Sequence, residues 1–91
     1  MDIEEIINRR RRQILVHSCI YYRFNSSVVT DTTFDRWAYE LVELQRKHQK
    51  VAKECVYADA FNGFDGSTGF DLPYYLPEIV DKAEQLLSYR K

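Results

Sequence analysis

Cysteine and glycine are scarce in this chain of 91 residues, and long apolar runs are missing. The two cysteines, Cys19 and Cys55, lack the close spacing of metal ligands, which argues against a zinc site and a disulfide-dense scaffold. We expect two reduced thiols, with a single disulfide as the alternative. Because no apolar stretch approaches the roughly 20 residues of a membrane-spanning helix, we expect no membrane partner.

Acidic and basic residues are almost equal in number, 14 against 13. A net charge of −1 gives no overall field toward nucleic acid or a membrane surface. Hydrophobic residues make up 45% and charged residues 30%, a balance typical of one small globular domain. The chain opens with acidic residues and no apolar leader follows them, so we expect a cytoplasmic protein, located in the host cytoplasm if its source is a virus.

The first half of the chain predicts two helices. From about Asp2 to Phe24, apolar residues recur every three or four positions, and the polar run 25–27 then ends the helix. A second helix is expected to begin at Thr30 or Asp31, either of which can cap its first amide groups. Its apolar stripe consists of Phe34, Trp37, Ala38, Leu41 and Leu44.

The second half predicts two more helices, separated by a loop that contains all three glycines. A short helix is expected from about Val51 to Asp59 or Phe61, and Pro77 is well placed to begin the last one. Phenylalanines interleave with the glycines over residues 61–73, which predicts an ordered loop folded back onto the helices. The expected fold class is therefore all-α, a bundle of about four helices in a single domain, 1–91.

A pattern of aromatic and acidic residues spans the first two helices. The aromatic pair Tyr21–Tyr22 precedes a short turn, Asp31 follows the turn, and Phe34–Asp35 leads into a leucine-rich helix that ends in Lys47–His48. This order resembles the N-terminal helical subdomain (Ia, nicotinamide mononucleotide-binding) of NAD⁺-dependent DNA ligases. The resemblance covers Ile14 to His48.

The resemblance implies a ligand. In the ligases this subdomain closes over NAD⁺ and holds its nicotinamide mononucleotide half. By resemblance, Tyr21 and Tyr22 would stack on or flank the nicotinamide ring, while Asp31 and Asp35 would accept hydrogen bonds from ribose hydroxyls or the carboxamide. Aromatic faces attract a cationic pyridinium, and carboxylates suit hydroxyl donors. Phe34 departs from the family, which usually has a tyrosine at that position.

These residues also have ordinary structural explanations. Tyr21 and Tyr22 can be packing residues at a helix end, Asp31 can serve as a helix cap, and Asp35 can lie favourably in the field of the helix dipole. The ligand-binding and the structural explanations both remain open at the level of sequence.

Ligase catalysis is not expected. It requires a lysine nucleophile two residues before an Asp-Gly pair, and the candidate segment Gly63-Phe64-Asp65-Gly66 has a glycine there. The ligase-like helical pair spans about 2–48, while residues 49–91 belong to a different design. The chain resembles in this respect small ligase-related proteins of bacteriophages. We expect a non-catalytic protein that requires neither a cofactor nor a metal.

Four consecutive arginines, Arg9, Arg10, Arg11 and Arg12, form a collar around the first helix instead of a stripe along it. Such a collar can grip phosphate or an acidic partner. A solvated surface with local ion pairs, such as Glu5 with Arg9, is the favoured alternative.

Three functions follow from these observations. The first is a binding module that captures nicotinamide mononucleotide, NAD or an NAD-derived signal molecule. The second is a protein-interaction module, for example a viral accessory or anti-defence protein that acts on a host enzyme. The third is a DNA-binding accessory protein that uses Arg9 to Arg12, and the near-neutral charge makes nucleic acid the less expected partner.

Overall fold

The computed structural model describes residues 2–67 and 69–89, and within them the chain forms four helices and no strand. The helices are α1 (Ile3–Tyr22), α2 (Asp31–Lys47), α3 (Gln49–Glu54) and α4 (Pro77–Tyr89). The predicted all-α fold class is confirmed. No helix in the described part of the chain is long and apolar enough to cross a bilayer.

The ends of α2 and α4 follow the local signals in the sequence. Thr30 caps α2, since its hydroxyl accepts a hydrogen bond from the Thr33 amide at 3.1 Å. Pro77 is the first residue of α4, where its missing amide hydrogen costs nothing. At the end of α1, Asn25 adopts a positive φ of 50°, which turns the chain back toward α2.

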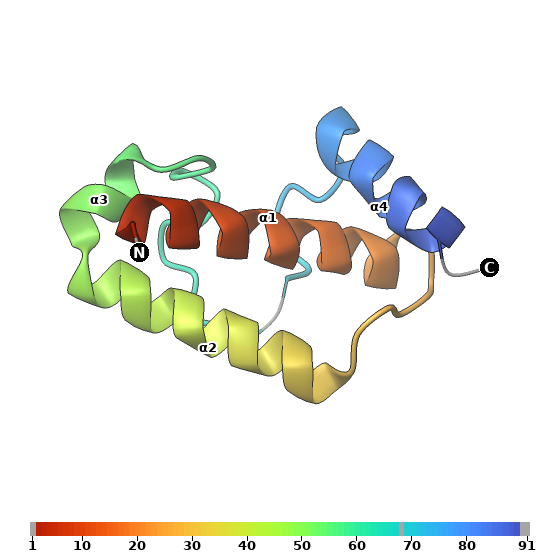
Figure 1. Ribbon diagram of the computed structural model, residues 1–91, viewed down its shortest axis with the longest axis horizontal. Helices are drawn as coiled ribbons and strands as arrows, with labels where there is room; N and C mark the ends of the chain where they lie inside the picture. The colour runs from red at the N-terminus through yellow and green to blue at the C-terminus, as the bar shows by residue number, and fades with distance from the viewer. Residues whose placement is uncertain (1, 68, 90–91) are drawn as a thin grey trace.

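Helix α1 is the centre of the molecule. In Figure 1, α2 returns antiparallel beside α1, and α4 crosses the C-terminal end of α1. Helix α3 packs against both α1 and α2, whereas among the described helices α1 is the one that α4 contacts. Residues on several sides of α1 are therefore buried, including Leu15, Val16, Cys19 and Ile20, in addition to the predicted stripe through Ile7 and Ile14.

The third helix is shorter than predicted. It ends at Glu54 and does not continue to Asp59 or Phe61. Cys55 is extended, with ψ 165°, and Tyr57 has a positive φ of 59°, so the backbone leaves the helical region at both positions. The segment that follows consists of turns, and Phe61 from this segment is buried in the core without being part of a helix.

The glycine-rich loop is ordered and packs on the helices, as predicted. Phe61 is only 1% exposed, and its ring meets that of Phe64 edge-on at 5.1 Å. Gly66 is buried against α2, where a β-carbon would lie 3.4 Å from the Val42 side chain, and Gly69 is buried against α1. The loop thereby closes one side of the gap between the two long helices.

Candidate functional site

A cavity of about 310 Å³ lies between the C-terminal end of α1, the start of α2 and the glycine-rich loop. All five residues predicted to contact a ligand line it: Tyr21, Tyr22, Asp31, Phe34 and Asp35. The antiparallel return of the chain brings them together, because the end of α1 and the beginning of α2 are neighbours in space. The other lining residues are His17, Ser18, Ser27, Val28, Val29, Ser67 and Gly69.

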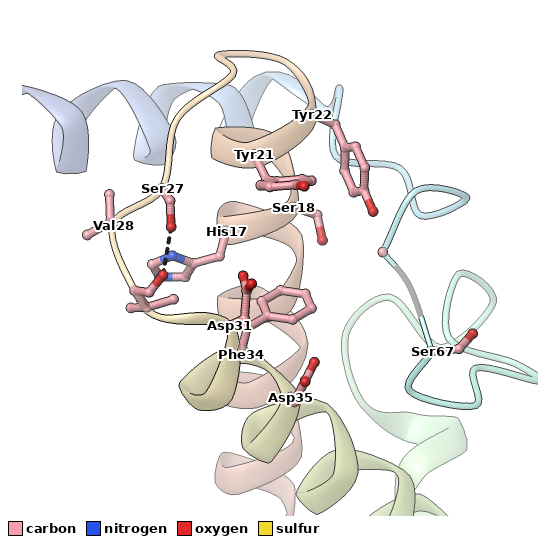
Figure 2. Close-up of a pocket in the computed structure, with 12 residues that line it drawn as sticks. His17, Ser18, Tyr21, Tyr22, Ser27, Val28, Asp31, Phe34, Asp35 and Ser67 are labelled. Carbon is pink, nitrogen blue, oxygen red and sulfur yellow. Dashed lines mark hydrogen bonds between the residues drawn. The ribbon is translucent and has the colours of Figure 1, made fainter.

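The two carboxylates in the cavity both come from the N-terminal part of α2. Thr30 takes the capping role, which leaves Asp31 as the first residue of α2 with its side chain toward the cavity (Figure 2). Asp35 follows one turn later on the same face. Neither carboxylate accepts a hydrogen bond from another described residue, so both are available to hydroxyl or amide donors of a ligand.

The aromatic residues of the cavity have different surroundings. Tyr21 is 58% exposed, and Figure 2 shows its ring lying across the cavity on the side opposite Phe34. Tyr22 packs instead on the second half of the chain, with its ring stacked on Tyr74 at 5.6 Å and edge-on to Phe70 at 5.2 Å. Tyr21 is thus the aromatic face available to a ligand, while Tyr22 holds the loop against α1.

Sequence reasoning missed His17 and Ser18, which line the same cavity one helical turn before Tyr21 and Tyr22. The signal was present, since residues four apart share one face of a helix. Ser18 is 1% exposed, and its hydroxyl has no hydrogen-bond partner among the described residues. The Nδ1 atom of His17 is likewise buried and unpartnered. No comparable signal pointed to Ser67 or Gly69, which lie far away in the sequence.

Burial lowers the pKa of His17 below its usual value of about 6.5. Its ring lies 5.2 Å from that of Trp37. The imidazole is therefore neutral at pH 7, and the lining residues carry two negative charges and no lysine or arginine. A cationic ligand suits this cavity better than an anion does.

The depressed pKa of His17 predicts that acid weakens the fold. The unfolded chain takes up a proton near pH 6.5 and the folded one only at lower pH, so the free energy of unfolding falls as pH drops below about 6.5. Denaturant titrations between pH 7.5 and 5.5, followed by Trp37 fluorescence, should show this decline. His17→Gln should flatten it, and an equally steep decline in that variant would contradict the assignment.

The chain was compared with protein-family models, curated proteins and solved structures. None of them matches. The resemblance to the ligase subdomain thus has no support from a known protein, and the observation that bears on function is the cavity itself.

The four arginines of the predicted collar have separate environments. Arg9 and Arg12 are exposed, whereas Arg10 forms an ion pair with Glu40 of α2 at 2.8 Å. Arg11 is 2% exposed. The favoured alternative, a solvated surface with a Glu5–Arg9 pair, is wrong in two respects: Arg10 pairs across helices, and Arg11 is buried because α1 has neighbours on several sides.

The two cysteines are buried. Cys19 and Cys55 are free thiols, so the alternative of a disulfide between them is not realised. Burial raises the pKa of both thiols, which keeps them protonated and weakly nucleophilic at neutral pH. Within residues 2–67 and 69–89, no three His, Cys, Asp or Glu side chains are grouped so that they could hold a metal ion.

Proposed function

We propose that the chain is a non-catalytic binding module whose cavity takes the nicotinamide riboside half of an NAD-derived molecule. The observation that carries this proposal is the convergence of Tyr21, Asp31 and Asp35 on one cavity, from two helices joined by a turn. The residues that the ligase-like motif selects lie together in this cavity, which supports the proposal.

The size and charge of the cavity support this ligand. A volume of about 310 Å³ is at the lower end of the range for small-molecule sites, which suits a nucleoside better than a whole dinucleotide. An oxidised nicotinamide ring is a cation, and the exposed face of Tyr21 offers it a favourable quadrupole. The carboxylates of Asp31 and Asp35 add attraction and accept from the ribose hydroxyls.

The same charges set the orientation of the ligand. A phosphate group would be repelled by Asp31 and Asp35, so the phosphate of nicotinamide mononucleotide has to project out of the cavity toward solvent. Nicotinamide riboside, which lacks the phosphate, should therefore bind at least as well as the mononucleotide. Reduced nicotinamide mononucleotide, whose ring is neutral, should bind less tightly than the oxidised form.

Isothermal titration tests the proposal with nicotinamide riboside, nicotinamide mononucleotide and its reduced form. We expect Tyr21→Leu to weaken binding of the oxidised ligands by about 2- to 30-fold, the equivalent of one cation–π contact. Asp35→Asn should weaken it by about tenfold through loss of a charge-assisted hydrogen bond.

Tyr39→Leu is the matched control. Tyr39 is also an exposed tyrosine, 65% accessible, but it lies on α2 outside this cavity. Its loss should leave affinity unchanged. An absence of heat at millimolar concentrations of all three ligands would refute nicotinamide capture, and equal affinity for the oxidised and reduced forms would refute the role of Tyr21.

The other two functions have less support from the geometry. A DNA-binding collar would have only Arg9 and Arg12 fully exposed, since Arg10 is paired and Arg11 buried. A protein-interaction module, acting on a host enzyme if the source is viral, would use the exposed aromatic side chains of Tyr21, Phe70 and Tyr75. Loss of nicotinamide binding in the titrations above would make that surface the next candidate.

A further inference from the structure

A second cavity, of about 550 Å³, lies between α2, α3 and residues 58–64. No lining residue is shared between the two cavities. The second cavity is lined by the side chain of Arg11, which reaches it from the middle of α1.

Arg11 is held there by uncharged groups. Its Nε donates to the Gln45 side-chain oxygen at 3.0 Å, and its Nη1 donates to the Val56 carbonyl at 2.9 Å. The guanidinium carbon lies 5.5 Å from the centre of the Phe61 ring. These contacts place the guanidinium in one orientation, and Nη2 donates no hydrogen bond to any described residue.

The positive charge of Arg11 has no counter-ion among residues 2–67 and 69–89. The ion pairs that the arginines of this region do form are Arg10 with Glu40 and Arg46 with Glu43. Burial accordingly lowers the pKa of Arg11. A buried charge with only neutral partners is costly, and proteins normally offset that cost with an opposite charge.

The rest of the cavity is suited to an anion. Lys53 and Arg46 line it together with Arg11, against the single carboxylate of Asp59. Because Arg46 is already paired with Glu43, Arg11 and Lys53 against Asp59 leave an excess of one positive charge. Gln49 and Asn62 add side-chain amides that can donate to oxygen.

We propose that this second cavity binds a small oxyanion, whose negative charge compensates the positive charge of Arg11. The chemical class is a phosphate monoester or a carboxylate, because the guanidinium fork recognises the oxygens of either group. The site shares no residue with the cavity proposed for nicotinamide riboside, so the two proposals can be tested separately. Its occupation would also tie α1, α2 and α3 together.

Inorganic phosphate is the first probe. Thermal unfolding in rising phosphate, against potassium chloride at equal ionic strength, should show a saturable stabilisation. In ¹⁵N spectra the Arg11 Nε resonance should move with phosphate concentration, while that of Arg10, which is occupied by Glu40, should not. Adenosine monophosphate and acetate, titrated in parallel, distinguish a phosphate monoester from a carboxylate as the preferred anion.

Variants of the exposed cations keep the test independent of folding. Lys53→Gln should weaken phosphate binding by about two- to fivefold, as expected of a partly screened charge, and Arg46→Gln should weaken it less, because Arg46 is paired with Glu43. Arg11→Met should abolish it, with circular dichroism reporting whether the variant folds. Arg9→Gln, on the same helix but outside the cavity, should have no effect.

A response to phosphate no larger than the response to chloride would overturn the proposal. So would saturable binding that neither Lys53→Gln nor Arg46→Gln weakens. Nicotinamide riboside, which has no phosphate, should bind equally to these variants and to the wild type, so failure of one site is distinguishable from failure of the other.

Discussion

Phe61→Ala should destabilise the protein by about 3–5 kcal/mol, the largest effect we expect from any single truncation. Phe61 is the bulkiest fully buried side chain, at 1% exposure. Its removal empties a space bounded by the Phe64 ring and the Arg11 guanidinium. Because small domains have only about 5–15 kcal/mol of stability in total, the variant would be close to unfolding.

Chemical denaturation of Phe61→Ala, with Phe70→Ala as its control, measures this effect. Phe70 comes from the same loop but is 60% exposed, so its truncation should cost about 1 kcal/mol or less. The melting temperature of Phe61→Ala should fall by roughly 4–8 °C for each kcal/mol lost. Equal costs for the two variants would show that the loop is not part of the core.

The contrast between Phe61 and Phe70 also shows where sequence reasoning ends. The phenylalanines and glycines of residues 61–73 predicted an ordered loop, and the helices were predicted from their periodicity and caps. Which phenylalanine is buried depends on how the loop crosses α1 and α2, and no local pattern encodes that crossing. The same holds for Arg11, whose burial follows from the number of helices around α1 and not from the run of four arginines.

Some residues of the candidate site could be predicted from the sequence, and others could not. Tyr21, Tyr22, Asp31, Phe34 and Asp35 were selected through a resemblance, and they line one cavity because a short turn joins two antiparallel helices. Helical spacing would have added His17 and Ser18. The wall formed by Ser67 and Gly69 comes from a contact distant in sequence, which periodicity and spacing do not report.

The glycines of the loop differ in what they require. Gly63 and Gly66 have positive φ angles of 82° and 85°, which disfavour any side chain on backbone grounds. At Gly69 the space for a side chain is limiting. A β-carbon at Gly69 would overlap the Ser18 hydroxyl and lie 3.0 Å from the Ser18 β-carbon.

Gly69→Ala should therefore destabilise the protein by about 1–3 kcal/mol through overpacking, and Ser18→Gly should relieve most of that cost. A double-mutant cycle, measured by denaturant unfolding, should give a coupling energy of about 1–3 kcal/mol between the two positions.

Gly63→Ala is the control: nothing lies within 4 Å of its β-carbon position, so its cost is a backbone cost that Ser18→Gly cannot relieve. Additive effects at positions 18 and 69 would contradict the contact. Ser18 and Gly69 both line the cavity that we propose for nicotinamide riboside, so Gly69→Ala should also weaken binding of that ligand. Ser18→Gly should restore binding only if the displaced loop, and not the loss of the serine hydroxyl, is the cause.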